Sequence, residues 1–143
     1  AAIGCAQIKK FPTFVEKRIH NFDRLKAALA GCEDKLILPE ACDNARPSWF
    51  GFLITCKEGV DRNKVVPYIE AHGVQTRMLF AGNLIKHPCF DQMRASGKGY
   101  RVIGDLSVTD RVMNNTFWVG VYPGMTDEMI DYMAKTITEA VNQ

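Results

Sequence analysis

One run near the middle of the chain carries no charge: Phe50-Gly51-Phe52-Leu53-Ile54-Thr55-Cys56. A short, continuous apolar run is typical of a buried strand, and it favours a central strand that is covered on both faces. Two further segments, Val74–Phe80 and Thr116–Val121, have strand character. We therefore expect a sheet of about three strands.

The segments around these strands have helical periodicity or helix-capping residues. Asp61 and Thr126 fit the N-cap position, where a side-chain oxygen accepts a hydrogen bond from a free backbone N–H. Gly73 fits the left-handed residue that follows a helix. Helices around a small sheet in this order predict an α+β domain with helices packed on one face. The expected helices cover Ala2–Lys10, Thr13–Leu29, Asp61–His72, Pro88–Arg94, Asp105–Met113 and the segment after Thr126.

Periodicity also predicts which side chains face the core. Strand alternation predicts one shared face for Val74, Thr76, Met78 and Phe80. Helical spacing predicts a buried stripe of Met129, Met133, Ile137 and Val141 on the last helix. Pro67 lies inside an expected helix, where we expect a kink or a later helix start. The segment Glu33–Pro47 contains two prolines and is expected to cross the surface in extended form.

Size and charge narrow the class of protein. The 143 residues suit one domain, and 47% hydrophobic with 24% charged residues is typical of a globular protein. A formal net charge of +2 is too small to indicate nucleic acid or an anionic membrane as the main partner. No apolar run approaches the roughly 20 residues that span a bilayer.

The cysteine pattern points to free thiols. The five cysteines are odd in number, and no two of them have the C-x-x-C spacing of a zinc site. His87 and Cys89 lie close together, but a second ligand pair is missing from the sequence. We therefore expect no metal site and no disulfide framework, as in a protein of the reducing cytoplasm.

The segment Gln75–Pro88 holds the candidate substrate-binding residues, because it brings a cation, an aromatic ring and an amide into one loop. Arg77 can hold a phosphate or carboxylate bidentately; the alternative is an ion pair on the sheet surface. Phe80 can form the wall of a pocket, and Asn83 can bind a hydroxyl; the alternative is local packing in a turn. His87 is interpreted equally well as a loop anchor. Trp49 and Trp118 are expected to serve packing.

Three motifs resemble a known family: Pro47-Ser48-Trp49-Phe50-Gly51-Phe52, Arg77-Met78-Leu79-Phe80-Ala81-Gly82-Asn83, and Phe117-Trp118-Val119-Gly120-Val121-Tyr122-Pro123-Gly124. With them the chain resembles the small C-terminal domain of fold-type I pyridoxal-phosphate enzymes. Among these it is similar to the DegT/DnrJ/EryC1/StrS sugar aminotransferases and dehydratases, and most of all to members that remove the C3 hydroxyl of CDP-4-keto-6-deoxy-D-glucose. The resemblance covers essentially the whole chain.

The resemblance implies a homodimeric, cytoplasmic parent enzyme with a large cofactor domain. Residues 1–30 would be a helical linker or interface segment next to that domain, and residues 31–143 the small domain. The parent would use pyridoxamine 5'-phosphate, a [2Fe-2S] cluster and a flavin/iron-sulfur reductase on a CDP-sugar. Its product would feed the 3,6-dideoxyhexoses of lipopolysaccharide O-antigen.

The same resemblance implies that no catalytic, cofactor-binding or metal-binding residue lies in this chain, which alone would be inactive. Its substrate-binding residues would be Arg77, Phe80 and Asn83. The chain lacks the family's Cys-x-Cys pair, and Pro67 departs from the pattern. Two alternatives stay open: the small domain of a pyridoxal-phosphate-dependent nucleotide-sugar aminotransferase, and a non-enzymatic ligand-binding or interaction module.

Overall fold

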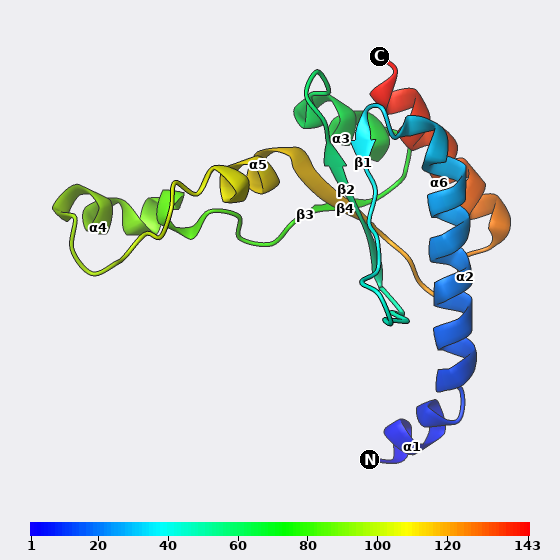
Figure 1. The fold of residues 1–143 in the computed structure, drawn as a ribbon. Coiled ribbons are helices and arrows are strands. Elements are labelled where there is room, and N and C mark those ends of the chain that lie inside the picture. The colour runs from blue at the N-terminus through cyan, green and yellow to red at the C-terminus, as the bar shows by residue number, and fades with distance from the viewer.

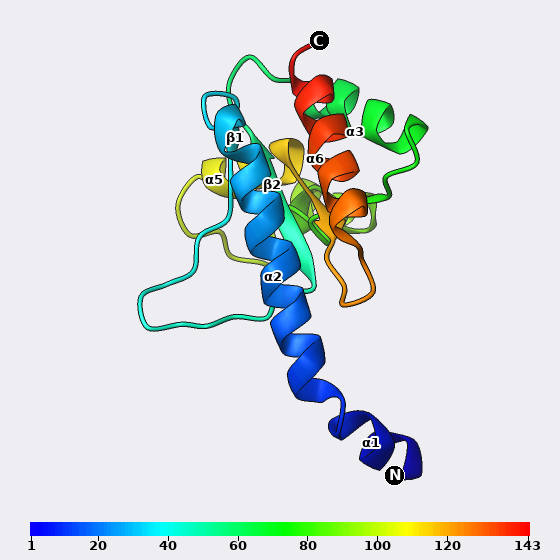
Figure 2. The ribbon, with the colours of Figure 1, turned by 90° about the vertical axis from the view of Figure 1, so that its right-hand side faces the viewer.

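A computed structural model describes all residues, 1–143, as a four-stranded antiparallel sheet with helices on one face (Figures 1 and 2). The strand order is β1-β2-β4-β3, with β1 at Leu36–Ile37, β2 at Gly51–Cys56, β4 at Thr116–Gly120 and β3 at Thr76–Met78. The covering helices are α2 (Phe11–Leu29), α3 (Arg62–Ala71) and α6 (Asp127–Val141), with α6 packed against the other two. The predicted α+β class is confirmed.

The fourth strand lies in the segment that was expected to be extended surface chain. After α2, a 3₁₀ turn (η1, Ala30–Cys32) leads into β1, where Leu36 and Ile37 pair with Cys56 and Thr55. Leu36 and Leu38 are buried. A strand of two residues is too short to show a period in the sequence, which explains why only three strands were expected.

The central strand β2 is covered on one face only, so the expectation of burial on both faces is wrong. Phe52 and Ile54 are fully buried, whereas Gly51, Leu53 and Thr55 on the other side are partly exposed. Alternate side chains of a strand point to opposite faces, and all three large helices lie on the same face. The second face therefore stays open, although its residues are also apolar.

A single core of 22 buried residues lies between the sheet and the helices. On α6 the buried stripe includes Met133, Ile137 and Val141, as predicted. Met129 is 50% exposed, which corrects its place in the stripe; Ile130 is buried instead. The buried face of α6 therefore begins one residue later than predicted. Ile130, and not Met129, shares the inner face with Met133, Ile137 and Val141.

The helix ends follow the predicted capping chemistry. The Asp61 carboxylate accepts a hydrogen bond from the Asn63 N–H at 2.9 Å, and the Thr126 hydroxyl accepts one from the Met129 N–H at 3.3 Å. Gly73 has a φ of +78°, which permits the left-handed turn after α3. Helix α3 begins at Arg62 and continues through Pro67.

The N-terminal helices extend beyond the sheet (Figures 1 and 2). Helix α1 (Ala2–Ile8) buries no residue, and α2 starts anew with Pro12 in its first turn. Ile3 and Phe11 are 80% and 61% exposed. The second half of α2 contributes Phe22, Leu25 and Leu29 to the core, and the boundary at residue 30 stays a prediction.

Between β3 and β4 the chain makes a long excursion, residues 79–115, which we call the arm. Figure 1 shows it projecting away from the sheet. It contains 3₁₀ turns η2 (Leu84–Lys86) and η3 (Pro88–Phe90) and helices α4 (Asp91–Ser96) and α5 (Ser107–Asn115), close to the expected helices.

The strand before the arm is shorter than predicted. Val74 and Thr76 are buried as expected, but Met78 is 43% exposed and Phe80 lies beyond the strand. Phe80 has a φ of +44°, so the extended backbone ends before it.

None of the helices has the length and apolar composition that crossing a bilayer requires.

Candidate functional site

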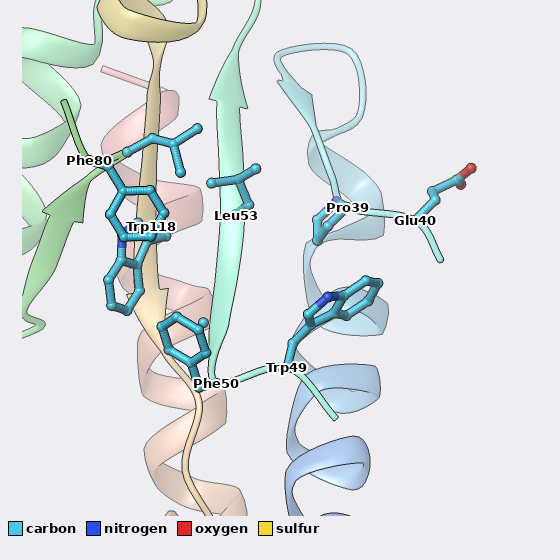
Figure 3. Close-up of a pocket in the computed structure, with 9 residues that line it drawn as sticks. Pro39, Glu40, Trp49, Phe50, Leu53, Phe80 and Trp118 are labelled. Atoms are coloured by element: carbon cyan, nitrogen blue, oxygen red, sulfur yellow. The ribbon is translucent and has the colours of Figure 1, made fainter. Parts of the chain in front are cut away.

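The open face of the sheet carries an apolar groove of ≈ 490 Å³ (Figure 3). Its residues come from four stretches of chain: the segment after β1, the start of β2, the middle of β4 and the first residues of the arm. They are Pro39, Glu40, Trp49, Phe50, Gly51, Leu53, Leu79, Phe80 and Trp118. The sheet is thus hollowed where no helix of this chain covers it.

Strand register builds the floor of this groove. Leu53 and Trp118 are opposite each other in the β2–β4 ladder, so both side chains lie on the open face. Phe50 meets the Trp118 ring edge to face, with centroids 5.4 Å apart. Gly51 leaves room for the indole, since a Cβ there would lie 2.6 Å from Trp118 Cε3. The floor therefore depends on a glycine as much as on the aromatic rings.

Phe80 lies at one side of the groove and is 78% exposed, across from Pro39 and Trp49 (Figure 3). Its φ of +44° is unusual for an aromatic residue and typically costs about 1–3 kcal/mol. The Phe80 N–H donates to the Met78 carbonyl at 2.8 Å and closes a tight turn. A strained backbone that presents an exposed ring to an apolar groove supports the predicted role of Phe80 as a pocket wall.

Arg77 points from β3 to the open face, opposite Trp118 in the ladder. Its guanidinium makes no hydrogen bond or ion pair in this structure, so the alternative of a surface ion pair is not found. It lines a second hollow of ≈ 530 Å³, in which it is the only charged residue. Trp118 lines both hollows, so the free cation and the aromatic groove are neighbours.

Asn83 is 2% exposed, and its amide is engaged inside the chain. Asn83 Nδ2 donates to Asp110 Oδ1 at 2.8 Å, and Lys86 Nζ reaches Asp110 Oδ2 at 2.7 Å. These two donors lower the pKa of Asp110 below its ordinary value. A direct contact of Asn83 with substrate stays a prediction. Asp110 itself was not foreseen, because nothing in the sequence pairs it with a loop 27 residues earlier.

Other groove residues were also missed or assigned only to packing. Trp49 does pack, with its ring centroid 4.5 Å from that of Phe22, yet it also lines the groove. Pro39 and Glu40 come from the segment that was expected to be plain surface chain. His87 Nε2 donates to the Ala81 carbonyl, which supports the interpretation of His87 as a loop anchor.

The described residues do not fit a redox cluster, and the groove by itself does not fit a phosphate-bearing cofactor. All five cysteines are free, and no group of three or more His, Cys, Asp or Glu side chains is arranged to hold a metal. Burial raises the pKa of the Cys56 thiol to about 11, which opposes metal binding because thiolate is the ligand form. The only ionisable side chain in the groove is Glu40, whose negative charge disfavours a phosphate.

The fold defines the class of protein. A solved structure of E. coli GDP-4-keto-6-deoxy-D-mannose-3-dehydratase with bound hydrated PLP matches 95% of this chain with a TM-score of 0.79 at 25% identity; the match covers 34% of that chain. The architecture is therefore that of one domain of an enzyme with the pyridoxal-phosphate aminotransferase fold.

The sequence then places it in a family. The model of the DegT/DnrJ/EryC1/StrS aminotransferase family matches residues 1–138, and the chain belongs to this family. It is 48% identical to the lipopolysaccharide biosynthesis protein RfbH of Salmonella typhimurium strain LT2, over 97% of this chain and 31% of that protein. It is 43% identical to dTDP-4-dehydro-2,6-dideoxy-D-glucose 3-dehydratase of Saccharopolyspora spinosa, over 99% of this chain and 30% of that protein. The chain thus spans about a third of the length of these relatives.

Proposed function

We propose that this chain is the small C-terminal domain of a pyridoxamine-phosphate-dependent dehydrase that removes the C3 hydroxyl of a nucleotide-linked 4-keto-6-deoxyhexose. The observation that carries the proposal is the 43% identity to a sugar 3-dehydratase across 99% of the chain. The finer proposal is CDP-4-keto-6-deoxy-D-glucose as substrate, in the synthesis of 3,6-dideoxyhexoses for O-antigen. The likeness to a lipopolysaccharide biosynthesis protein supports that pathway.

In this proposal the domain binds and orients the substrate. The unpaired Arg77 guanidinium holds the diphosphate, because its planar fork matches two phosphate oxygens. Phe80 and Trp118 offer apolar surface to the nucleotide sugar and keep water from that side. The pyridoxamine phosphate and the [2Fe-2S] cluster belong to chain outside residues 1–143. The parent enzyme is a cytoplasmic homodimer served by a flavin/iron-sulfur reductase.

A second candidate is a nucleotide-sugar aminotransferase. It is favoured by the matched family, whose description names aminotransferases. The two reactions give different products, since a dehydrase releases water from C3 and an aminotransferase places an amine on the sugar. Residues of this domain do not separate them, because both reactions need the same diphosphate and sugar contacts.

The test is product analysis with the full-length protein. It is loaded with pyridoxamine phosphate, given a reductase system and incubated with CDP-, GDP- and dTDP-4-keto-6-deoxyhexoses in separate reactions. The proposal expects a 3-deoxy product, with the CDP-sugar turned over fastest. A 4-amino sugar formed from glutamate would assign the aminotransferase instead, and faster turnover of another nucleotide would correct the substrate.

The role of Arg77 is tested in the same enzyme. Arg77→Ala is expected to raise the KM for the nucleotide sugar about tenfold or more, the effect of one lost charge-assisted hydrogen bond. Arg77→Lys keeps the charge but loses the bidentate fork, so it should recover only part of the affinity. An unchanged KM in Arg77→Ala would remove this residue from the site.

A further inference from the structure

We propose that Asp110 is a positioning residue for the substrate-facing loop, residues 79–83, and that it acts through the side-chain amide of Asn83. This inference rests on the proposed function, because it explains how Phe80 is held toward the substrate. It assigns to Asn83 a role in the loop and not a contact with the sugar.

The central observation is an amide–carboxylate pair in which the amide is buried and the carboxylate is partly exposed. Asn83 is 2% exposed and donates from Nδ2 to Asp110 Oδ1 at 2.8 Å. The second carboxylate oxygen accepts from Lys86 Nζ at 2.7 Å. Each Asp110 oxygen therefore binds one residue of the segment that leaves β3. Asp110 lies on α5, in the chain that returns to the sheet. The pair therefore ties the two legs of the arm together close to where they leave the sheet.

Backbone packing on Met113 supports the same role. Gly82 has a φ of +64°, and a Cβ on it would lie 2.4 Å from Met113 Cγ. The Asn83 N–H points at Met113 Sδ, 3.2 Å away. The loop backbone thus rests directly on the Met113 side chain of α5, about one helical turn from Asp110.

Arg62 fixes α5 to the sheet. Its Nη1 donates to the Met113 carbonyl at 2.9 Å and contacts Met78 Sδ at 3.1 Å. The end of β3 and the end of α5 are therefore held by one guanidinium. Arg62 thus anchors α5 to the sheet. The hydrogen bond from Asn83 to Asp110 of α5 then sets the position of the loop, and with it the position of the Phe80 ring three residues earlier.

The chemistry of the pair allows a charge-swap test. Asn83→Asp places two carboxylates at hydrogen-bond distance in a partly buried site, where like charges repel. Adding Asp110→Asn restores one donor and one acceptor with the direction of the bond reversed. Restoration by a second substitution is the signature of a direct pair. A residue that touches substrate with its own amide is not rescued in this way.

The experiment uses the full-length enzyme with the nucleotide sugar that the wild type turns over best. Asn83→Asp is expected to raise KM about tenfold or more, because a hydrogen bond to a charged group is replaced by repulsion between two carboxylates, with kcat changed less than about threefold. The double variant Asn83→Asp/Asp110→Asn should return KM to within about threefold of wild type. Lys135→Gln is the control and should change KM by less than about threefold, since its exposed ion pair with Glu139 lies on α6, outside the arm.

Hydrogen exchange of the amides of residues 79–83 gives a readout that is independent of turnover. Exchange should be faster in Asn83→Asp and slow again in the swap. If Asn83→Asp does not fold, Asp110→Asn alone should show a smaller rise in both KM and exchange. A folded swap variant with KM no better than Asn83→Asp would overturn the inference in favour of a direct sugar contact. If wild type turns over no 4-keto sugar, the proposed function fails, and unchanged exchange in Asn83→Asp would separately reject the positioning role.

Discussion

The two faces of the sheet are made of similar apolar residues, but helices cover one face and leave the other exposed. On the face toward the helices, Phe52, Ile54 and Val119 are fully buried. On the other face, Leu53 and Trp118 are only partly buried and form the floor of a groove. Apolar composition therefore does not tell where the core is. On one face it holds the domain together, and on the other it leaves an exposed apolar groove, a feature that often marks a contact surface.

The largest expected effect separates these faces with two neighbours in β2. Ile54→Ala should lower the free energy of unfolding by about 2–5 kcal/mol, since it leaves a cavity in a closed core. Leu53→Ala should cost less than about half as much, because its side chain is already partly exposed. Urea denaturation followed by circular dichroism measures both. Equal losses would mean that the open face is part of the core.

A smaller effect tests the floor of the groove. Gly51→Ala should cost about 1–3 kcal/mol and shift the fluorescence of Trp118, because its Cβ collides with the indole. The matched control is Gly120→Ala, which lies opposite in the register and has open space at its Cβ. An unaltered emission spectrum in Gly51→Ala would show that the ring moves aside freely.

On the covered face, a helix cap gives a change of about 1 kcal/mol. Thr126→Ala removes the hydroxyl that accepts the Met129 N–H at the start of α6 and should lower stability by about that amount. Thr13→Ala is the control, because Thr13 is exposed in the first turn of α2 and caps nothing; it should stay within about 0.5 kcal/mol. Thermal or urea unfolding decides between them.

Near neutral pH the smallest expected effect comes from Cys56 on the covered face, because its titration changes stability only above pH 9. Burial raises the pKa of this thiol from 9.0 to about 11. The unfolded chain therefore loses this proton first, and the stability that the neutral thiol provides is present below pH 9 and declines between pH 9 and 11. Cys56→Ala should flatten the stability curve in that range.

Thiol labelling extends the same comparison. A thiol reagent should modify exposed Cys42 in the native protein, and Cys56 only after unfolding. Equal labelling rates for Cys42 and Cys56 would contradict the burial of this face.

Much of the fold was predictable because local chemistry marks it. The Asp61 and Thr126 caps and the Gly73 turn were read from single residues whose role needs no tertiary context. Two errors have one cause. The run around Leu53 was expected to be covered twice, and Met129 was expected to be inside. A sequence pattern shows that a residue is apolar. Whether a helix packs over that residue depends on segments far away in the chain.

The candidate site was predictable only in part. Arg77, in β3, and Phe80, in the loop that follows, have residue types that indicate a ligand. Phe80 lines the groove on the open face, and Arg77 lines the second hollow, which α6 also walls. Glu40 and Asp110 carry no such local signal, because tertiary folding alone brings them to the groove and to Asn83. Direct substrate contact stays a prediction for Arg77 and Phe80, whereas for Asn83 we propose a positioning role in place of the predicted contact.

The arm has a consequence for how such domains diversify. It starts after β3 and ends before β4, two strands that pair directly through Met78 and Phe117. Its ends are therefore fixed side by side, whatever lies between them. Closing a longer loop costs only about 0.6 kcal/mol for each doubling of its length. The arm can thus be shortened, extended or exchanged between homologues without rebuilding the core, and a chimaera that receives another member's residues 79–115 should still fold while its choice of ligand changes.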